Sequence, residues 1–219
     1  MARMRGLALF DLDNTLADRE RAFRRWCEDF VGQHGLGRSA IATLVEADND
    51  GHASRADFFS TVRHRFSLAD SVETLIAEYR AGYPSDYYRC EPGTLAGLAS
   101  LREAGWKVAI VTNGPPSQEE KIHMTGLSDV VDAWCVSEVV GTSKPEPRIF
   151  EEAARRCAVP LTGWMVGDSP EADIAGGIGV GLRTCWLTRG RAWPEVTYEP
   201  DALVSDVAHA IQLILVDRS

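Results

Sequence analysis

Short apolar runs alternate with amphipathic helical segments over the second half of this chain, and that alternation restricts the possible folds more than any other feature. The runs typical of buried strands are residues 6–11, 106–114, 130–136, 163–168 and 182–188. The segments with helical spacing are residues 93–105, 117–127, 146–159, 171–180 and 206–216. Strands that alternate with helices imply right-handed crossovers and a parallel sheet. We therefore predict an α/β, Rossmann-like parallel sheet with helices on both faces.

An all-helical block interrupts this pattern after the first strand. Apolar residues recur there at helical intervals, which predicts roughly four helices and no strand. The predicted core of the block includes Trp26, Phe58 and Phe59. We therefore predict a catalytic core formed by residues 1–16 and 91–219, with an inserted helical domain at residues 17–90. In the core, Ser117 and Glu120 have the spacing of a capping box, which predicts the start of one helix.

Composition excludes several classes of function. The net charge is −9 and there is no basic stripe, which argues against a nucleic-acid partner. No apolar stretch is long enough to span a membrane, and the N-terminal apolar run is too short for a signal peptide. The five cysteines are scattered and contain no CxxC pair, which favours a reducing compartment. These features predict a cytoplasmic protein with no membrane association.

Polar side chains follow the predicted strands at the points where the strands end. Ligands of open α/β sheets bind at this carboxyl edge, so we expect these side chains to lie close together. They are Asp11, Asp13, Thr112, Asn113, Lys144 and Asp168.

The spacing of Asp11 and Asp13 raises a specific chemical question. Residues i and i+2 of a strand share one face, so two like charges would lie together unless a cation or a chemical step separates them. Carboxylate and carbonyl oxygens suit Mg²⁺. One carboxylate can attack phosphorus to form an aspartyl-phosphate, and a second can protonate the leaving alcohol. The lysine and the metal would offset the repulsion between anions. The pattern therefore predicts phosphoryl transfer through a covalent intermediate, with Mg²⁺ as cofactor.

Four motifs closely resemble those of the haloacid dehalogenase-like hydrolase superfamily. They are "DLDNT", "TNG", "SKP" and "GDSPEAD", in this order, and the resemblance covers nearly the whole chain. It implies that residues 17–90 are a helical cap of that superfamily's first (C1) class. It also implies a phosphomonoester hydrolase.

The resemblance assigns a role to each matching residue. It implies that Asp11 is the nucleophile and that Asp13 is the general acid/base, with its backbone carbonyl on Mg²⁺. Asp11 and Asp168 would bind the metal through their carboxylates. The resemblance further implies that Thr112 and Asn113 bind the phosphoryl group and that Lys144 neutralises charge and binds the phosphate. Thr15 would brace the loop through hydrogen bonds. Asp173 would order the metal-bound waters or Lys144.

The core stretches also resemble one branch of the superfamily. Residues 112–132, 144–153 and 166–187 are similar to pyrimidine 5′-nucleotidases and N-acylneuraminate phosphatases. The partner expected is a small phosphorylated metabolite, with nucleoside 5′-monophosphates first. A sugar phosphate phosphatase or a phosphomutase on the same scaffold remains an alternative, as does a catalytically silent binding module. The filled acid/base position disfavours a haloalkanoate dehalogenase. The sequence does not indicate an oligomeric state.

Overall fold

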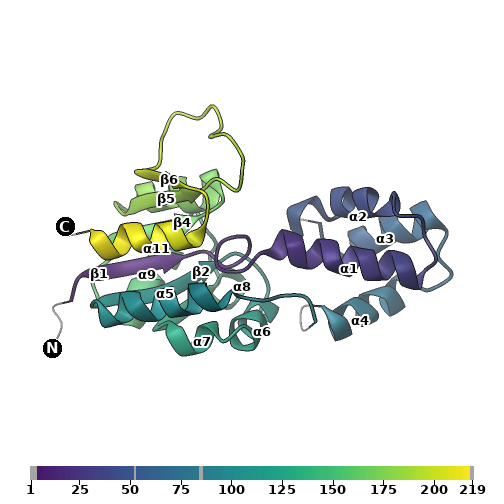
Figure 1. Cartoon of the computed structure of the whole chain (residues 1–219), viewed down its shortest axis with the longest axis horizontal. Coiled ribbons are helices and arrows are strands. Elements are labelled where there is room, and N and C mark those ends of the chain that lie inside the picture. The colour runs from purple at the N-terminus through teal and green to yellow at the C-terminus, as the bar shows by residue number, and fades with distance from the viewer. Residues whose placement is uncertain (1–3, 52, 84–85, 218–219) are drawn as a thin grey trace. The chain divides into compact units, whose positions relative to one another are not determined.

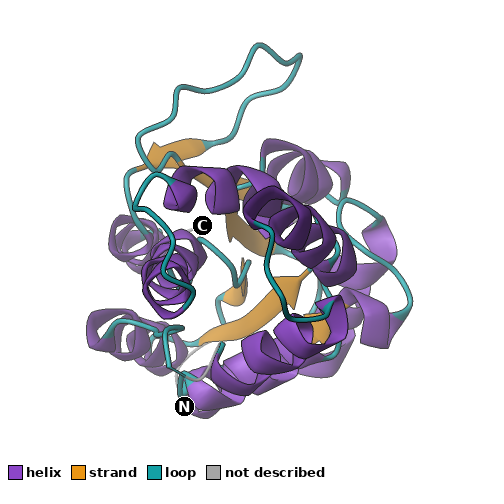
Figure 2. Cartoon of the chain, turned by 90° about the vertical axis from the view of Figure 1, so that its right-hand side faces the viewer, coloured by secondary structure: helices purple, strands orange, loops and turns teal. Residues whose placement is uncertain are grey.

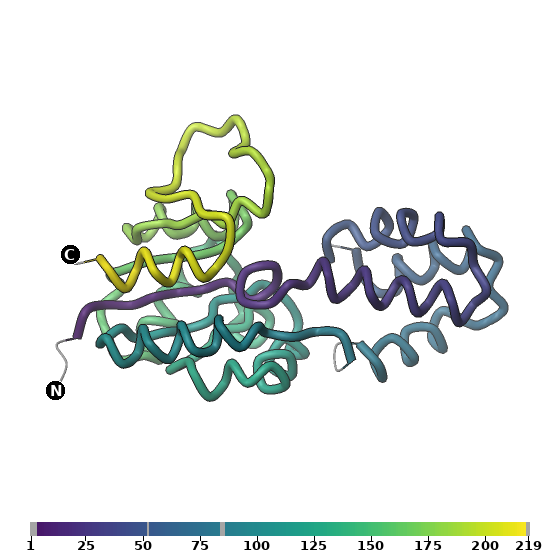
Figure 3. Tube along the Cα trace, in the orientation of Figure 1, coloured from purple at the N-terminus to yellow at the C-terminus, as the bar shows by residue number. Residues whose placement is uncertain are grey.

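The chain divides into two compact units, which are described separately below. The computed structural model describes residues 4–51, 53–83 and 86–217. One unit comprises Met1–Ala17 and Cys90–Ser219 and is called here the sheet unit. The other comprises Asp18–Arg89 and is called the helical unit. Figure 3 follows the chain from the first strand into the helical unit and back.

The sheet unit is built on six parallel strands. They are β1 (Gly6–Phe10), β2 (Trp106–Thr112), β3 (Ala133–Val136), β4 (Gly163–Gly167), β5 (Arg183–Leu187) and β6 (Ala202–Val204). Their order in the sheet is β3-β2-β1-β4-β5-β6 (Figure 1). β1 therefore lies between β2 and β4, and every residue of β1 is buried, as expected for a parallel strand covered on both faces. Because all six strands run in the same direction, the loops after β1, β2 and β4 emerge side by side at one edge.

Helices pack against these strands (Figures 1 and 2). They are α5 (Pro92–Glu103), α6 (Ser117–Met124), α7 (Leu127–Val130), α8 (Ser137–Val140), α9 (Pro147–Cys157), the π-helical turn η2 (Pro170–Ala175), α10 (Gly176–Gly179) and α11 (Val207–Val216). α9 covers the face that carries Leu7 and Leu9, where Ile149 and Phe150 join the core. α5 and α11 pack against each other on the other face. The α/β prediction, with a parallel sheet and helices on both faces, is confirmed.

The described residues of the helical unit form helices and no strand. The helices are α1 (Arg19–Gln33), α2 (Ala40–Asp48), the short 3₁₀ turn η1 (Asn49–Gly51), α3 (Arg55–Phe66) and α4 (Val72–Gly82). Their core is aromatic: the ring of Trp26 lies 4.9 Å from that of Phe30 and 5.0 Å from that of Tyr79. Trp26, Phe58 and Phe59 are all buried, which confirms their predicted place in this core.

A buried ion cluster joins three elements of the helical unit. The carboxylate of Asp48 accepts hydrogen bonds from Arg19 at 2.6 Å and from Arg55 at 2.7 Å. Both guanidinium groups also lie over aromatic rings, Arg19 over Phe23 and Arg55 over Phe58. Each cation thus has a carboxylate and an aromatic neighbour, which explains how Arg19 is buried and Arg55 partly buried.

Several local predictions were wrong. The capping box is absent because α6 begins at Ser117 itself and Pro116 is the cap residue, with no side-chain cap bond. The third strand starts at Ala133 rather than at residue 130, because Val130 ends α7. β6 was not predicted, since it has only three residues and none is fully buried. Within the described residues, no helix is both long enough and apolar enough to cross a membrane.

Candidate active site

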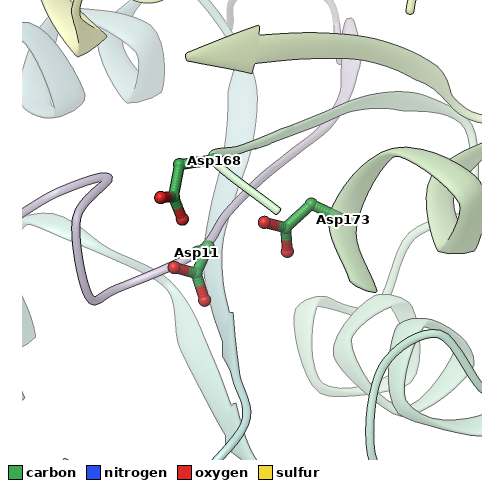
Figure 4. A group of neighbouring side chains, drawn as sticks. All are labelled: Asp11, Asp168 and Asp173. Atoms are coloured by element: carbon green, nitrogen blue, oxygen red, sulfur yellow. The ribbon is translucent and has the colours of Figure 1, made fainter. Parts of the chain in front are cut away.

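Three buried carboxylates converge at the carboxyl edge of the sheet. Asp11 follows β1, Asp168 follows β4, and Asp173 lies in η2. One oxygen from each lies within 4.8 Å of the others, and Figure 4 shows the three side chains gathered in one place. Hard oxygen ligands at this spacing are suited to a divalent cation such as Mg²⁺.

A lysine from a distant loop joins two of these carboxylates. The Nζ of Lys144 lies 2.6 Å from Oδ1 of Asp11 and 2.6 Å from Oδ1 of Asp173. The lysine side chain is only 2% exposed. Asp173 is itself oriented by the backbone N–H of Ser169, which donates to its Oδ2 at 2.9 Å. Gly167 permits this arrangement, because a Cβ at that position would collide with the Asp173 carboxylate.

Burial and mutual contacts both affect the ionisation of Asp11 and Lys144. Burial raises the pKa of Asp11 to about 8, with Lys144 opposing the rise and Asp173 and Asp168 adding to it. Burial by itself would lower the pKa of Lys144, but the two carboxylates it contacts raise that pKa above its usual range. Lys144 therefore supplies positive charge to both Asp11 and Asp173.

Asn113 holds the loop that carries Lys144. Its Oδ1 accepts from the backbone N–H of Lys144 at 2.8 Å, and its Nδ2 donates to the Lys144 carbonyl at 2.9 Å. Both polar atoms of the Asn113 side chain are thus engaged with backbone. The phosphoryl-binding role predicted for Asn113 stays a prediction, and its backbone N–H or its second amide hydrogen could donate to such a group.

Asp13 is not part of the acidic cluster. Its carboxylate accepts from Nε2 of Gln118 at 2.8 Å and from Nζ of Lys121 at 3.0 Å, both on α6. Gln118 also donates to the hydroxyl of Thr112 at 3.1 Å. Each aspartate of the "DLDNT" motif therefore has its own lysine. Gln118 and Lys121 were not predicted from the sequence, where the signal available was their i, i+3 spacing just after "TNG".

Two arginines approach Asp168 from the long loop between β5 and β6. Arg191 donates to the Asp168 carbonyl at 2.8 Å and to its Oδ2 at 3.1 Å. Arg189 lies 3.6 Å from the same oxygen. The Asp168 carbonyl also accepts from Nε1 of Trp186 at 2.8 Å. Two donors, from Arg191 and Trp186, therefore hold the backbone at Asp168. These arginines were not predicted, because a loop of this length shows no periodic pattern.

Thr15 takes part in the loop through its backbone and not through its hydroxyl. The hydroxyl is buried and has no hydrogen-bond partner among the described residues. The backbone N–H groups of Thr15, Leu16 and Ala17 all donate to the carbonyl of Leu12. These backbone hydrogen bonds close the turn without a contribution from the hydroxyl.

The comparisons with known proteins agree with this geometry. A family model described as haloacid dehalogenase-like hydrolase matches residues 6–181. The chain is 32% identical over 193 residues to a glyceraldehyde 3-phosphate phosphatase of Pyrococcus abyssi, covering 83% of this chain and 81% of that protein. It is 36% identical over 126 residues to the pyrimidine 5′-nucleotidase YjjG of Escherichia coli, covering 56% of each. Among solved structures, a HAD phosphatase from Thermococcus onnurineus matches with a TM-score of 0.66 and 26% identity, covering 98% of this chain and 100% of that one.

Proposed function

Because this chain belongs to the haloacid dehalogenase-like hydrolases, we propose that it is a Mg²⁺-dependent phosphatase that forms an aspartyl-phosphate. The observation that carries the proposal is the grouping of Asp11, Asp168 and Asp173, two of which contact Lys144, with Asp13 held separately by Lys121 of α6. That arrangement separates a nucleophile from an acid/base, although the two residues are only two positions apart.

The roles of the residues follow from their surroundings. Asp11 attacks the phosphorus, since its carboxylate is at the centre of the cluster and Lys144 reduces its repulsion from the incoming phosphate. Asp13 then protonates the leaving alkoxide and later takes a proton from the hydrolytic water. Thr112 and the backbone N–H of Asn113 bind the phosphoryl oxygens.

The metal site fits a hard cation. Asp11 and Asp168 would hold Mg²⁺ through their carboxylates and Asp13 through its backbone carbonyl, while Asp173 orders Lys144. When bound, Mg²⁺ would neutralise charge on the transferring phosphoryl group. The three buried carboxylates, which offer hard oxygen ligands within 4.8 Å of one another, support the assignment.

We propose that the helical unit corresponds to the cap expected at residues 17–90 and that it selects the substrate. The substrate class is a small metabolite phosphomonoester in the cytoplasm, with pyrimidine nucleoside 5′-monophosphates placed first. A triose or other sugar phosphate is the second candidate, because the relative named for glyceraldehyde 3-phosphate matches a larger share of the chain than the nucleotidase does.

The test is phosphate release from a panel of substrates, with and without Mg²⁺. The panel contains uridine and thymidine monophosphates, glyceraldehyde 3-phosphate, hexose phosphates and phosphoglycolate. Release that depends on Mg²⁺ supports the phosphatase. A sugar phosphate that exceeds every nucleotide by tenfold, about 1.4 kcal/mol in transition-state binding, would replace the nucleotide assignment. Conversion of a hexose phosphate to its isomer without free phosphate would identify a phosphomutase instead.

A further inference from the structure

Lysine is rare in this chain, and its placement is selective. Of 23 lysines and arginines, three are lysines, so the remaining twenty are arginines. Lys144 contacts Asp11, and Lys121 contacts Asp13. Lys107, at the start of β2, contacts Asp132. A lysine ammonium is a compact charge with three donors, whereas arginine presents a wide planar fork. Two of the three lysines are therefore committed to the paired aspartates of the candidate active site.

The contact between Lys121 and Asp13 is symmetric and largely shielded from water. The ammonium lies 3.0 Å from each carboxylate oxygen of Asp13. Only 11% of the lysine side chain and 22% of the aspartate side chain are exposed. Gln118, one turn earlier on the same face of α6, adds a bond to Oδ2 at 2.8 Å. Three hydrogen bonds from one helix thus restrict the rotation of this carboxylate.

The backbone before α6 is shaped to admit Gln118. Gly114 has a φ of +149°, which glycine adopts without strain, and a Cβ at this position would lie 2.9 Å from Cγ of Gln118. The Gln118 side chain is buried and also contacts Thr112. The side chains that hold Asp13 are therefore fixed relative to the loop that follows β2.

We propose that Lys121, assisted by Gln118, is a positioning residue that holds the carboxyl group of Asp13 apart from Asp11 and directed at the leaving-group oxygen. The inference rests on the proposed function, since it needs Asp13 to be the acid/base. An unrestrained aspartate would have to be ordered at each turnover, and prior orientation removes that cost. Lys121 acts through Asp13 and does not touch the reacting atoms.

The first test compares two substrates in the full-length protein. Lys121→Met should lower kcat on an alkyl phosphomonoester by about tenfold or more, part of the 10²–10⁴-fold that a general acid contributes. On 4-nitrophenyl phosphate, whose leaving group needs little protonation, the loss should stay within about threefold. Lys121→Arg, which can still pair with a carboxylate, should recover most of the alkyl-phosphate rate. Lys107→Met removes a comparable lysine–aspartate pair at the other end of β2 and should leave both rates unchanged.

A double-mutant cycle separates positioning from general damage. In an Asp13→Asn background, Lys121→Met should cause no further loss on the alkyl phosphate, because the two residues act as one unit. Equal losses on both substrates, or losses that multiply in the double variant, would overturn the inference. If Lys121→Met does not fold by circular dichroism, Lys121→Gln takes its place in the same cycle. A wild-type protein that releases phosphate from neither substrate would overturn the proposed function itself. If the wild type is active and Lys121→Met has the same rate on the alkyl phosphate, only the positioning role is overturned.

Discussion

The ammonium of Lys144 lies 2.6 Å from Oδ1 of Asp11, although 133 positions separate the two residues in the chain. The same ammonium contacts Asp173, so one buried cation serves two carboxylates while Asp168 lies beside them. Arg191 in turn lies 3.1 Å from Oδ2 of Asp168, so two cations from separate loops contact the three carboxylates.

Asp11→Asn should reduce phosphate release by at least ~10³-fold, because an amide cannot attack phosphorus although it has the same shape as the carboxylate. The protein should remain folded, as checked by circular dichroism, and should still bind substrate in calorimetry. Turnover within tenfold of wild type would contradict a covalent intermediate on this residue.

Asp13→Asn should cost at least ~10²-fold on alkyl phosphates, the usual scale for loss of a general acid. The effect should shrink on aryl phosphates, whose leaving groups need no proton. Comparing kcat on the two substrate types measures this difference. An equal loss on both would mean that Asp13 does not donate the proton.

Mg²⁺ should be required for turnover, and Ca²⁺ should inhibit it. Mg²⁺ keeps a tight octahedron, whereas Ca²⁺ accepts more oxygens at longer distances. Ca²⁺ could therefore take both oxygens of Asp11 and leave neither to attack. Activity should be lost on chelation and return when Mg²⁺ is added back. Full activity after exhaustive chelation would exclude the metal role of Asp168.

Lys144→Met should lower the free energy of unfolding in metal-free buffer by about 3–5 kcal/mol, because it leaves buried carboxylates without their cation. Urea denaturation measures this change. Added Mg²⁺ should restore part of the loss by binding the folded state. Lys107→Met, whose lysine is about one-third exposed, is the matched control and should cost less. Equal stability of the Lys144→Met variant and the wild type would contradict the buried charge network.

The stability of the sheet unit should depend on the ionisation of Asp132. Burial would raise the pKa of this carboxyl, but bonds from Lys107 and from the Val108 N–H, with Arg102 nearby, lower it below its usual value. Because the pKa of Asp132 is lower in the folded protein, its ionisation stabilises the fold at pH values above the unfolded pKa of 3.8. This stabilisation is lost as the pH falls through the pKa of the folded state.

Asp132→Asn should therefore destabilise the protein by about 1–3 kcal/mol at neutral pH. The difference from wild type should shrink as the pH falls from about 4 through the lowered folded pKa, because the wild-type carboxyl then becomes neutral as well. Urea denaturation at several pH values measures it. A difference that is constant across this range would exclude the charge as its cause.

Sequence patterns alone were sufficient to predict the architecture and the edge of the sheet where the site lies. The strand at residues 163–168 and the helix at residues 146–159 are buried or amphipathic over their whole lengths, and such periodicity is a local property. A parallel sheet then brings the ends of its strands together by topology, so Asp11 and Asp168 were expected to meet before any distance was known. β6 and α7 were missed because three or four residues are too few to show a period.

The choice of partner for each side chain was decided only by the tertiary structure. The order of the motifs did not indicate that Asp13 contacts Lys121, that the Asn113 side chain is engaged with the Lys144 backbone, or that Arg191 reaches Asp168. It also did not indicate that the Thr15 hydroxyl has no partner among the described residues. A difference of a few tenths of an ångström in the distance between two residues decides whether each of these contacts forms. The residues are far apart in the chain, and their rotamers are set by packing. Local sequence patterns indicate which face of a helix or strand carries a side chain and where a strand ends. They do not indicate which donor forms a hydrogen bond with a given acceptor.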